Sequence, residues 1–341
     1  MDRARIDGSM YGDQYLFYST DALKTLPYLP DTAGQLNVLS TYRNQNIACQ
    51  TIQMTEARQI PVTIDNYFSK RAFTTDSVFS DFNGVMIKWL VDTKKVYDQT
   101  LFNSFIGTAV STTGQQSQTV TLPTAGSGNA DAESYNRLVA ETIAQKVADI
   151  LIALKDVSRD YNDNQYLRSY DSEDILIVWN ADWVNKLKKV DMPTIFHKDG
   201  LIDKFDEDNV LPGRYFGTLN TSSTAAGSGK RMLVEAYFPA GGGTEITITN
   251  PEQSNLAGAL HAFPGDLIPA SCTAAANHSY TENPKVICKI MAKDSVPYMS
   301  GFQVNTEFVN SRNLSENHYL TFAHNKLEYL KEKPFVTVAT T

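Results

Sequence analysis

The sequence predicts a mixed α+β fold. Apolar residues recur at three- and four-residue steps over residues 76–105 and 132–154, which predicts two long amphipathic helices. Continuous apolar runs of strand length lie in the second half of the chain, and 175–179 (ILIVW) is the clearest of them. Residues 1–75 show little helical periodicity and contain extended runs instead. Helices and strands are therefore both expected, with an N-terminal part that builds no compact core of its own.

The composition is that of an ordinary globular protein and argues against several functional classes. The chain has 341 residues, 42% apolar and 20% charged, which is enough for one large or two intertwined domains. Its net charge is -8 with no run of five like charges, so it lacks the basic stripe of a dedicated nucleic-acid reader. Cys49, Cys272 and Cys288 show no disulfide or metal spacing. Because no signal-peptide core or membrane-length apolar run occurs, we expect a soluble protein made in the cytoplasm.

The N-terminal part predicts an arm rather than a domain. Two extended runs, 46–54 and 61–72, flank the polar stretch 55–59 (TEARQ), which predicts a two-stranded ribbon. Such a ribbon is marginal alone, so we expect it to project and to bury its apolar side chains on other copies of the chain. The alternative is a hairpin at the edge of a larger sheet of the same chain.

The first helix carries the strongest pattern, with Asp76 as its expected cap. If continuous to Phe105, it is about 45 Å long. The apolar positions at helical spacing are Val78, Phe79, Phe82, Val85, Met86, Trp89, Val96, Phe102 and Phe105, together with Thr93. This stripe predicts that Trp89 is buried and that it anchors the helix against the closing strand near 302–309.

The remaining elements are predicted in order along the chain. Residues 107–131 form a loop with one short strand, and the helix 132–154 follows with an apolar stripe. Its members are Tyr135, Leu138, Val139, Ile143, Val147, Ile150, Leu151 and Leu154. The strand 175–179 leads into Asn180, which is expected to cap a short helix carrying Trp183, Val184 and Leu187 inward. Further strands are expected to end at Gly217 and to cover 233–238, 302–310, 318–325 and 331–339, while 253–284 has too weak a pattern to place.

Two stretches are similar to ligand-binding loops but differ where the chemistry is decided. In 224–231 (TAAGSGKR), Thr224 and Arg231 stand where a phosphate-binding loop has glycine and a magnesium-holding hydroxyl, so a hairpin tip over 222–230 is expected. In 160–171 (DYNDNQYLRSYD), Asp160, Asn162 and Asn164 alternate like calcium ligands. However, Gln165 and Asp171 replace the required glycine and glutamate, so a connector is expected, with adventitious calcium as the alternative.

The remaining candidates also have simpler explanations. The acidic cluster 203–209 (DKFDEDN) is expected to be a solvated turn. The five histidines are His197, His261, His278, His318 and His324, and none has the spacing of a metal motif. We therefore predict no catalytic residue, no cofactor-binding residue and no metal ligand.

The order of these elements resembles the outer domain and closing strands of the tailed-bacteriophage major capsid (head) protein family. The likeness covers most of the chain and rests on pattern and order. It implies an N-terminal arm and extended β loop over 1–75, followed by a long spine helix. It also implies a peripheral domain over 76–165 plus 296–325 and an axial domain over 166–295 plus 326–341.

The resemblance further implies a structural protein and not an enzyme. Copies would assemble into pentamers and hexamers, and these into an icosahedral head shell enclosing double-stranded phage DNA. The implied partners are other copies of the chain, scaffolding, portal and decoration proteins, and packaged DNA in non-specific proximity. The chain would be part of the virion, assembled in the host cytoplasm without cofactors or membrane contact. The alternatives are an encapsulin-like compartment protein and a soluble α/β enzyme whose site the sequence does not reveal.

Overall fold

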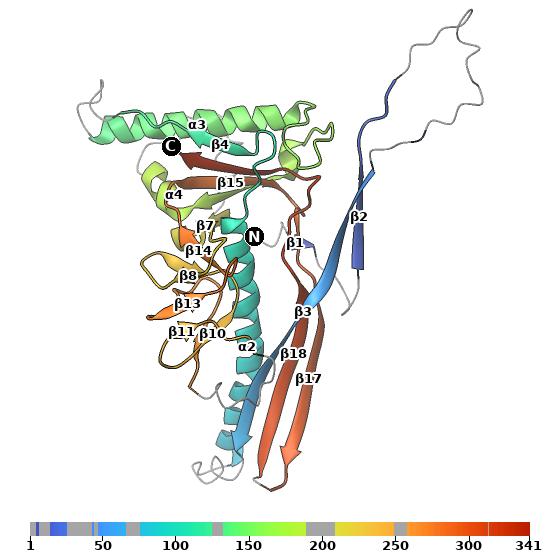
Figure 1. Ribbon diagram of the computed structural model, residues 1–341, viewed down its shortest axis with the longest axis vertical. Helices are drawn as coiled ribbons and strands as arrows, with labels where there is room; N and C mark the ends of the chain where they lie inside the picture. The colour runs from blue at the N-terminus through green and yellow to red at the C-terminus, as the bar shows by residue number, and fades with distance from the viewer. Residues whose placement is uncertain are drawn as a thin grey trace, which may run out of the picture.

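The subunit is elongated and mixes helices with sheets, as the sequence predicts. The structure, a computed structural model, describes residues 5–6, 14–25, 43, 47–65, 76–124, 132–188, 209–248, 258–312 and 314–341. A five-stranded sheet under helix α3 forms one end, and helix α2 runs from it beside three long strands (Figure 1). A lobe of short strands lies along the other side of α2. None of the described helices combines the length and hydropathy that crossing a bilayer requires.

The long sheet is built around one strand of 19 residues, β3. Its order is β17-β18-β3-β2, with β17 at Ser300–Asn310, β18 at Ser315–Asn325, β3 at Ile47–Asp65 and β2 at Gln14–Thr20. Along β3 the partner changes: residues 47–53 pair with β2, and residues 54–65 pair with β18, both antiparallel. The first described strand, β1 (Arg5–Ile6), pairs separately with β16 (Val296–Pro297).

The predicted two-stranded ribbon is therefore wrong. The stretch 55–59 contains no glycine, proline, asparagine or aspartate that would turn the chain, and its residues continue the ladder with β18. Ile52, Met54 and Ile64 are already buried within the subunit, so burying them does not require contact with another copy of the chain. The structure shares with the alternative that this segment joins a larger sheet of its own chain, but it does so as one continuous inner strand and not as a hairpin at the edge.

Helix α2 (Asp76–Thr108) begins at the predicted cap and packs against β3 and β18. Its buried face carries Leu90, Tyr97 and Leu101, and the rings of Tyr97 and Phe322 meet edge to face at 5.6 Å. The predicted anchor is wrong, because Trp89 is 60% exposed. The helix has apolar residues on two faces, and Trp89 lies one residue, about 100°, from the face that meets the sheet.

The second sheet has the order β4-β19-β15-β5-β6 and is covered by α3. Its strands are β4 (Ser117–Val120), β19 (Phe335–Thr340), β15 (Val286–Ala292), β5 (Ile175–Asn180) and β6 (Val210–Leu211). Helix α3 (Ala132–Lys155) buries most of the predicted stripe on it, while Tyr135 is half-buried and Leu138 is exposed. A short 3-10 turn, η2 (Ser172–Asp174), leads into β5.

The predicted cap of the short helix α4 (Ala181–Lys188) is confirmed. Asn180 Oδ1 accepts the Asp182 N–H at 3.0 Å, and its Nδ2 donates to the Val286 carbonyl at 2.9 Å. Trp183 and Val184 are buried as predicted, whereas the side chain of Leu187 lies outside the described residues. One buried amide therefore both starts the helix and ties β5 to β15.

The lobe of short strands corrects three predictions. It contains η5 (Gly213–Tyr215), β7 (Gly217–Leu219), β8 (Thr224–Ala225), β9 (Lys230–Met232), β10 (Ala236–Phe238), β11 (Gly243–Thr244), β12 (Leu260–Ala262), β13 (Cys272–Ala274) and β14 (Ser279–Glu282). A strand begins rather than ends at Gly217, because the residues before it form η5. The predicted strand 233–238 is only β10, and 222–230 is no hairpin tip, because β8 pairs with β13 while β9 pairs with β14. The stretch 253–284 supplies β12, β13 and β14.

A buried lysine lies inside the five-stranded sheet. Lys289 on β15 is fully buried, and its Nζ donates to the Ala109 carbonyl at 2.7 Å and to Thr337 Oγ1 at 2.9 Å. Burial lowers the pKa of Lys289 to about 7, because the protonated amine loses its hydration. The unfolded chain restores the ordinary pKa near 10.5, so between these values it binds more protons than the folded chain.

We therefore expect the free energy of unfolding to rise as pH increases from about 7 to 10, by about 1.4 kcal/mol for each unit of pKa depression. Lys289→Met should flatten this rise in urea titrations of the subunit. Lys285→Met, which removes an exposed lysine of the same segment, is the matched control and should keep it. An unchanged pH slope in Lys289→Met would contradict the assignment.

Candidate assembly surfaces

A buried polar cluster fixes how α2 lies on the long sheet. The Tyr97 hydroxyl and His324 Nε2 are 2.8 Å apart, and His324 Nδ1 lies 2.9 Å from the Asn325 carbonyl oxygen. Since only Nδ1–H can donate to that carbonyl, Nε2 accepts from Tyr97. Burial lowers the pKa of His324 and raises the pKa of Tyr97, so both groups are neutral. Asp98, one residue on, accepts from Tyr298 at 2.6 Å and from Lys94 at 2.7 Å.

This packing leaves an apolar stripe of α2 uncovered. Val78, Val85, Trp89 and Val96 are separated by 7, 4 and 7 residues, which places all four on one side of a helix. Their exposed fractions are 47%, 65%, 60% and 51%. We call these four residues the α2 stripe. Exposed apolar side chains aligned along one side of a helix suit contact with a protein partner.

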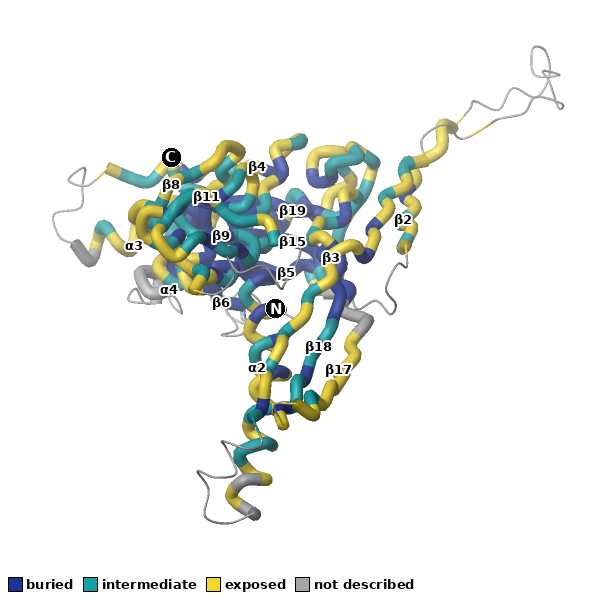
Figure 2. Tube along the Cα trace, turned by 60° about the horizontal axis from the view of Figure 1, so that its bottom comes forward, coloured by how far each residue is buried: buried dark blue, intermediate teal, exposed yellow. Residues whose placement is uncertain are grey.

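The outer strand of the long sheet is a second uncovered surface. β17 pairs with β18 on one side, and no described strand pairs with its other edge. Val304 and Phe308 lie on the same face of this strand, and both are exposed. Figure 2 shows β17 as exposed along most of its length. Unpaired backbone donors and acceptors with exposed apolar side chains suit association with another chain.

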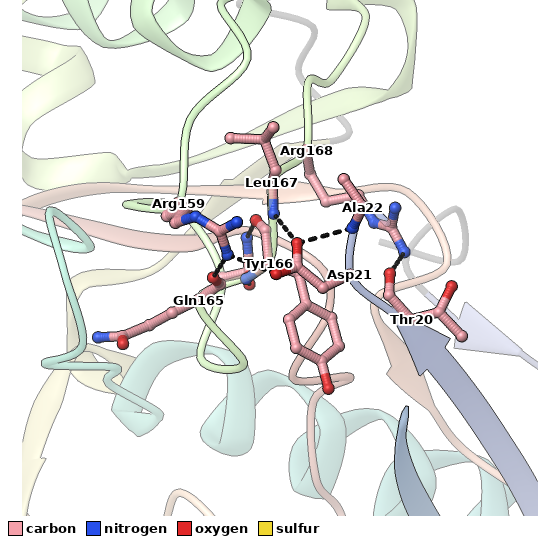
Figure 3. Close-up of polar contacts among 9 residues, drawn as sticks. Thr20, Asp21, Ala22, Arg159, Gln165, Tyr166, Leu167 and Arg168 are labelled. Atoms are coloured by element: carbon pink, nitrogen blue, oxygen red, sulfur yellow. Dashed lines mark hydrogen bonds and ion pairs between the residues drawn. The ribbon is translucent and has the colours of Figure 1, made fainter. Parts of the chain in front are cut away.

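The arm strand β2 is tied to the body at its end. The Asp21 carboxylate accepts from Arg159 at 2.7 Å and from the Leu167 N–H at 3.0 Å, while Arg168 donates to the Thr20 carbonyl at 2.6 Å (Figure 3). The Arg159 guanidinium and the Leu167 N–H lower the pKa of Asp21 to about 2. The anchor is therefore charged at any pH well above 2. Asp21 is 138 residues from Arg159 and 146 residues from Leu167 in the sequence, so no local sequence pattern indicates these contacts.

The stretch 160–171 is a connector, as predicted, and its polar side chains are used internally. Asn162 accepts the Tyr166 N–H and donates to the Tyr166 carbonyl, both at 2.7 Å. Asn164 donates to Ser19 of the arm at 2.9 Å. Gln165 has φ +54°, the left-handed conformation for which a calcium loop uses glycine. The loop therefore binds its own chain through the groups that a calcium ion would need.

The other candidate residues lie close to groups of their own subunit. Arg231 forms an ion pair with Glu282 and donates to the Gly265 carbonyl at 2.9 Å. His261 pairs with Glu235 at 2.6 Å, and His278 pairs with Glu245 at 2.8 Å. His318 is buried beside Glu316 at 3.9 Å. Residues 203–208 of the acidic cluster and His197 lie outside the described residues.

A cavity of about 710 Å³ separates the lobe of short strands from α2 and the long sheet. Arg58, Tyr97, Glu235 and His324 are among the residues that line it. Arg58 forms an ion pair with Glu235 at 3.2 Å, so a charge pair links β3 to the lobe across this space. Tyr97 and His324 bind each other here, while Arg58 Nε is buried without a hydrogen bond among the described residues.

Comparison with known proteins agrees with this picture of a subunit held by its own contacts and open along two apolar surfaces. The sequence model of the Phi29-like phage major capsid proteins matches residues 11–338. The chain belongs to this family of phage major capsid proteins. Among curated proteins, none matches the sequence.

Solved capsid structures share the fold of this capsid protein. The capsid structure of Staphylococcus phage Andhra is similar with a TM-score of 0.59 and 11% identity, over 99% of this chain and 83% of that chain. A chain in the structure of the head fibre and inner core protein of native bacteriophage P68 has a TM-score of 0.58 and 12% identity, with the same coverage. At such identities the likeness shows a common fold.

Family membership makes the capsid protein a component of the virion that self-associates into a head shell. The predicted resemblance to the tailed-phage major capsid proteins is confirmed, and the encapsulin-like alternative is not favoured. The mixed α+β class is confirmed as well.

Because Leu90 is buried and Trp89 is exposed, we expect substitutions of these two neighbours to change the stability of the capsid subunit by different amounts. Leu90→Ala should lower the free energy of unfolding by about 2–5 kcal/mol, because it empties a buried site. Trp89→Ala should change it by less than about 0.5 kcal/mol, because Trp89 is 60% exposed and lies outside the buried face of α2. Urea unfolding measures both, and a larger loss for Trp89→Ala than for Leu90→Ala would contradict the packing.

The arm anchor predicts a local effect of Asp21→Asn. Removing the charge weakens the bonds to Arg159 and the Leu167 N–H, so β2 should be released from the body more often. Limited proteolysis of the subunit should then cut within 14–25 faster, without a change in the thermal midpoint of the body. Asp171→Asn, which alters an exposed aspartate in the same connector, is the control, and equal cleavage of both variants would contradict the anchor.

Proposed function

We propose that the capsid protein builds an icosahedral head shell from pentamers and hexamers that encloses double-stranded phage DNA. The observation that carries this proposal is the family match across 11–338, together with the uncovered α2 stripe and β17 edge. A subunit of a closed shell needs surfaces that contact neighbouring subunits. We assign the α2 stripe to contact with a second copy of the chain.

The proposal includes the division of the subunit into parts. Residues 1–75 form the arm and extended loop, 76–165 plus 296–325 the peripheral domain, and 166–295 plus 326–341 the axial domain. On this division α2 is the spine helix. Its length of 33 residues and its position along the long sheet support that role. The two domains share a core, because α3 of the first packs on β5, β15 and β19 of the second.

The proposed partners beyond other copies are scaffolding, portal and decoration proteins and packaged DNA. The net charge of -8 supports a shell that does not attract the packaged DNA electrostatically. Assembly is assigned to the host cytoplasm. We further propose that the chain has no catalytic activity, which is supported by the internal pairing of the candidate loops 160–171 and 224–231.

Negative-stain electron microscopy of the purified protein tests this function, with the ratio of absorbance at 260 and 280 nm reporting nucleic acid. We expect closed icosahedral particles. Soluble subunits that never close, or closed particles that carry a protein cargo and no nucleic acid, would contradict the proposal.

The α2 stripe gives the sharpest variant. Trp89→Glu places a charge in the proposed contact and should abolish closed particles, because a buried unpaired charge costs several kcal/mol at each copy. Circular dichroism and urea unfolding should show that the subunit itself stays folded. Val91→Glu alters an equally accessible apolar residue outside the stripe and should still assemble. Normal particles from Trp89→Glu would overturn the assignment of the stripe.

A further inference from the structure

We propose that Glu307, Glu316 and His318 form a binding site for a divalent transition-metal ion, with Zn²⁺ as the best match. One ligand atom from each residue lies within 4.8 Å of the other two. The site sits on the long sheet near the turn between β17 and β18, away from the arm anchor and from the α2 stripe. It is independent of the shell function proposed above.

The ladder between β17 and β18 brings the three side chains together. Glu307 is directly opposite His318, and Glu316 precedes His318 by two residues on the same strand. Because side chains alternate across a strand, all three project from one face of the sheet. The register therefore fixes two ligands on one strand and the third on its neighbour.

His318 is buried beside one of the two carboxylates of this group. Its side chain is 7% exposed, and the contact of its ring with a described residue is the Glu316 carboxylate at 3.9 Å. That distance is too long for a hydrogen bond. Leu320 on the same strand is also buried, and Val62 of β3 stands opposite His318 in the ladder. A buried imidazole beside two carboxylates is an arrangement that a metal ion can bind.

The ligand set selects the kind of ion. Two carboxylates and a neutral imidazole supply two negative charges and one nitrogen, which suits Zn²⁺ and similar transition metals better than Ca²⁺ or Mg²⁺. Ligands about 2 Å from a tetrahedral ion lie roughly 3.3 Å from each other. The 3.9 Å between His318 and Glu316 is near this value, and the exposed Glu307 is free to rotate toward them. Three protein ligands leave a fourth position for water or for a group of another chain.

Bound metal would tie β17 to β18, and β17 lies at the edge of the long sheet among the strands that the structure describes. Two other pairs, His261 with Glu235 and His278 with Glu245, offer only two ligands each and are already closed at hydrogen-bond distance. These pairs therefore serve as internal controls for weak, non-specific binding by histidine and glutamate.

The test is equilibrium dialysis of the chelator-treated full chain against ZnCl₂, with bound zinc measured by mass spectrometry. We expect one zinc per chain and a higher thermal midpoint with zinc than with chelator. Glu307→Gln and His318→Gln should each weaken zinc binding by at least about tenfold. His278→Gln should bind zinc as the parent does.

Several outcomes would overturn the site. These are no zinc bound, equal binding by Glu307→Gln and the parent, or a preference for CaCl₂ or MgCl₂ over ZnCl₂ in competition. If His318→Gln fails to fold, Glu307→Gln decides, because its exposed side chain supports no packing. Loss of zinc binding with unchanged shell assembly would leave the proposed function standing, so failure of one proposal is separable from failure of the other.

Discussion

The ladder between β3 and β18 is the constraint on which the rest of the subunit depends. It joins residues 54–65 to 315–325, segments at least 250 positions apart in the sequence. Without it, residues 54–65 of β3 would lose their paired strand, and α2 would keep only its packing on the five-stranded sheet and the lobe. The ladder also places Phe322 and His324 under Tyr97, which determines which side of the helix is buried. Loop closure over such a distance costs entropy that local pairing does not, so this contact must be stabilised by the burial it makes possible.

Elements whose signal is local were predicted well from the sequence. The helix 132–154 lies within one residue of α3, and Asn180 caps α4 as expected, because periodicity and capping depend on neighbours a few residues away. The strands near 302–310 and 318–325 were found for the same reason. The lobe of short strands was missed because strands of two to four residues are too short to show a period, and their partners are fixed by distant segments.

The errors at the surfaces have a different physical cause. The first helix has apolar residues on two faces, and a periodic pattern does not say which face belongs to the subunit's own sheet and which to a neighbour. Trp89 was assigned to the interior on that ground, whereas Leu90 occupies it. The polar stretch 55–59 separates two extended runs in the sequence, but it lacks turn-forming residues, so polarity alone does not end a strand there. Of the proposed metal ligands, Glu316 and His318 are two residues apart on one strand, which is visible in the sequence. Glu307 is brought next to them only by the pairing register of β17 and β18.

The change of partner along β3 has a mechanical consequence. The strand is bonded to β2 up to Gln53 and to β18 from Met54 onward, so tension applied to the arm passes along a single covalent backbone from one ladder into the other. A pull along the strand axis loads many parallel backbone hydrogen bonds at once in shear, rather than opening them one by one. In a shell whose subunits exert force on each other, β3 would distribute a force applied at β2 over the whole length of the long sheet.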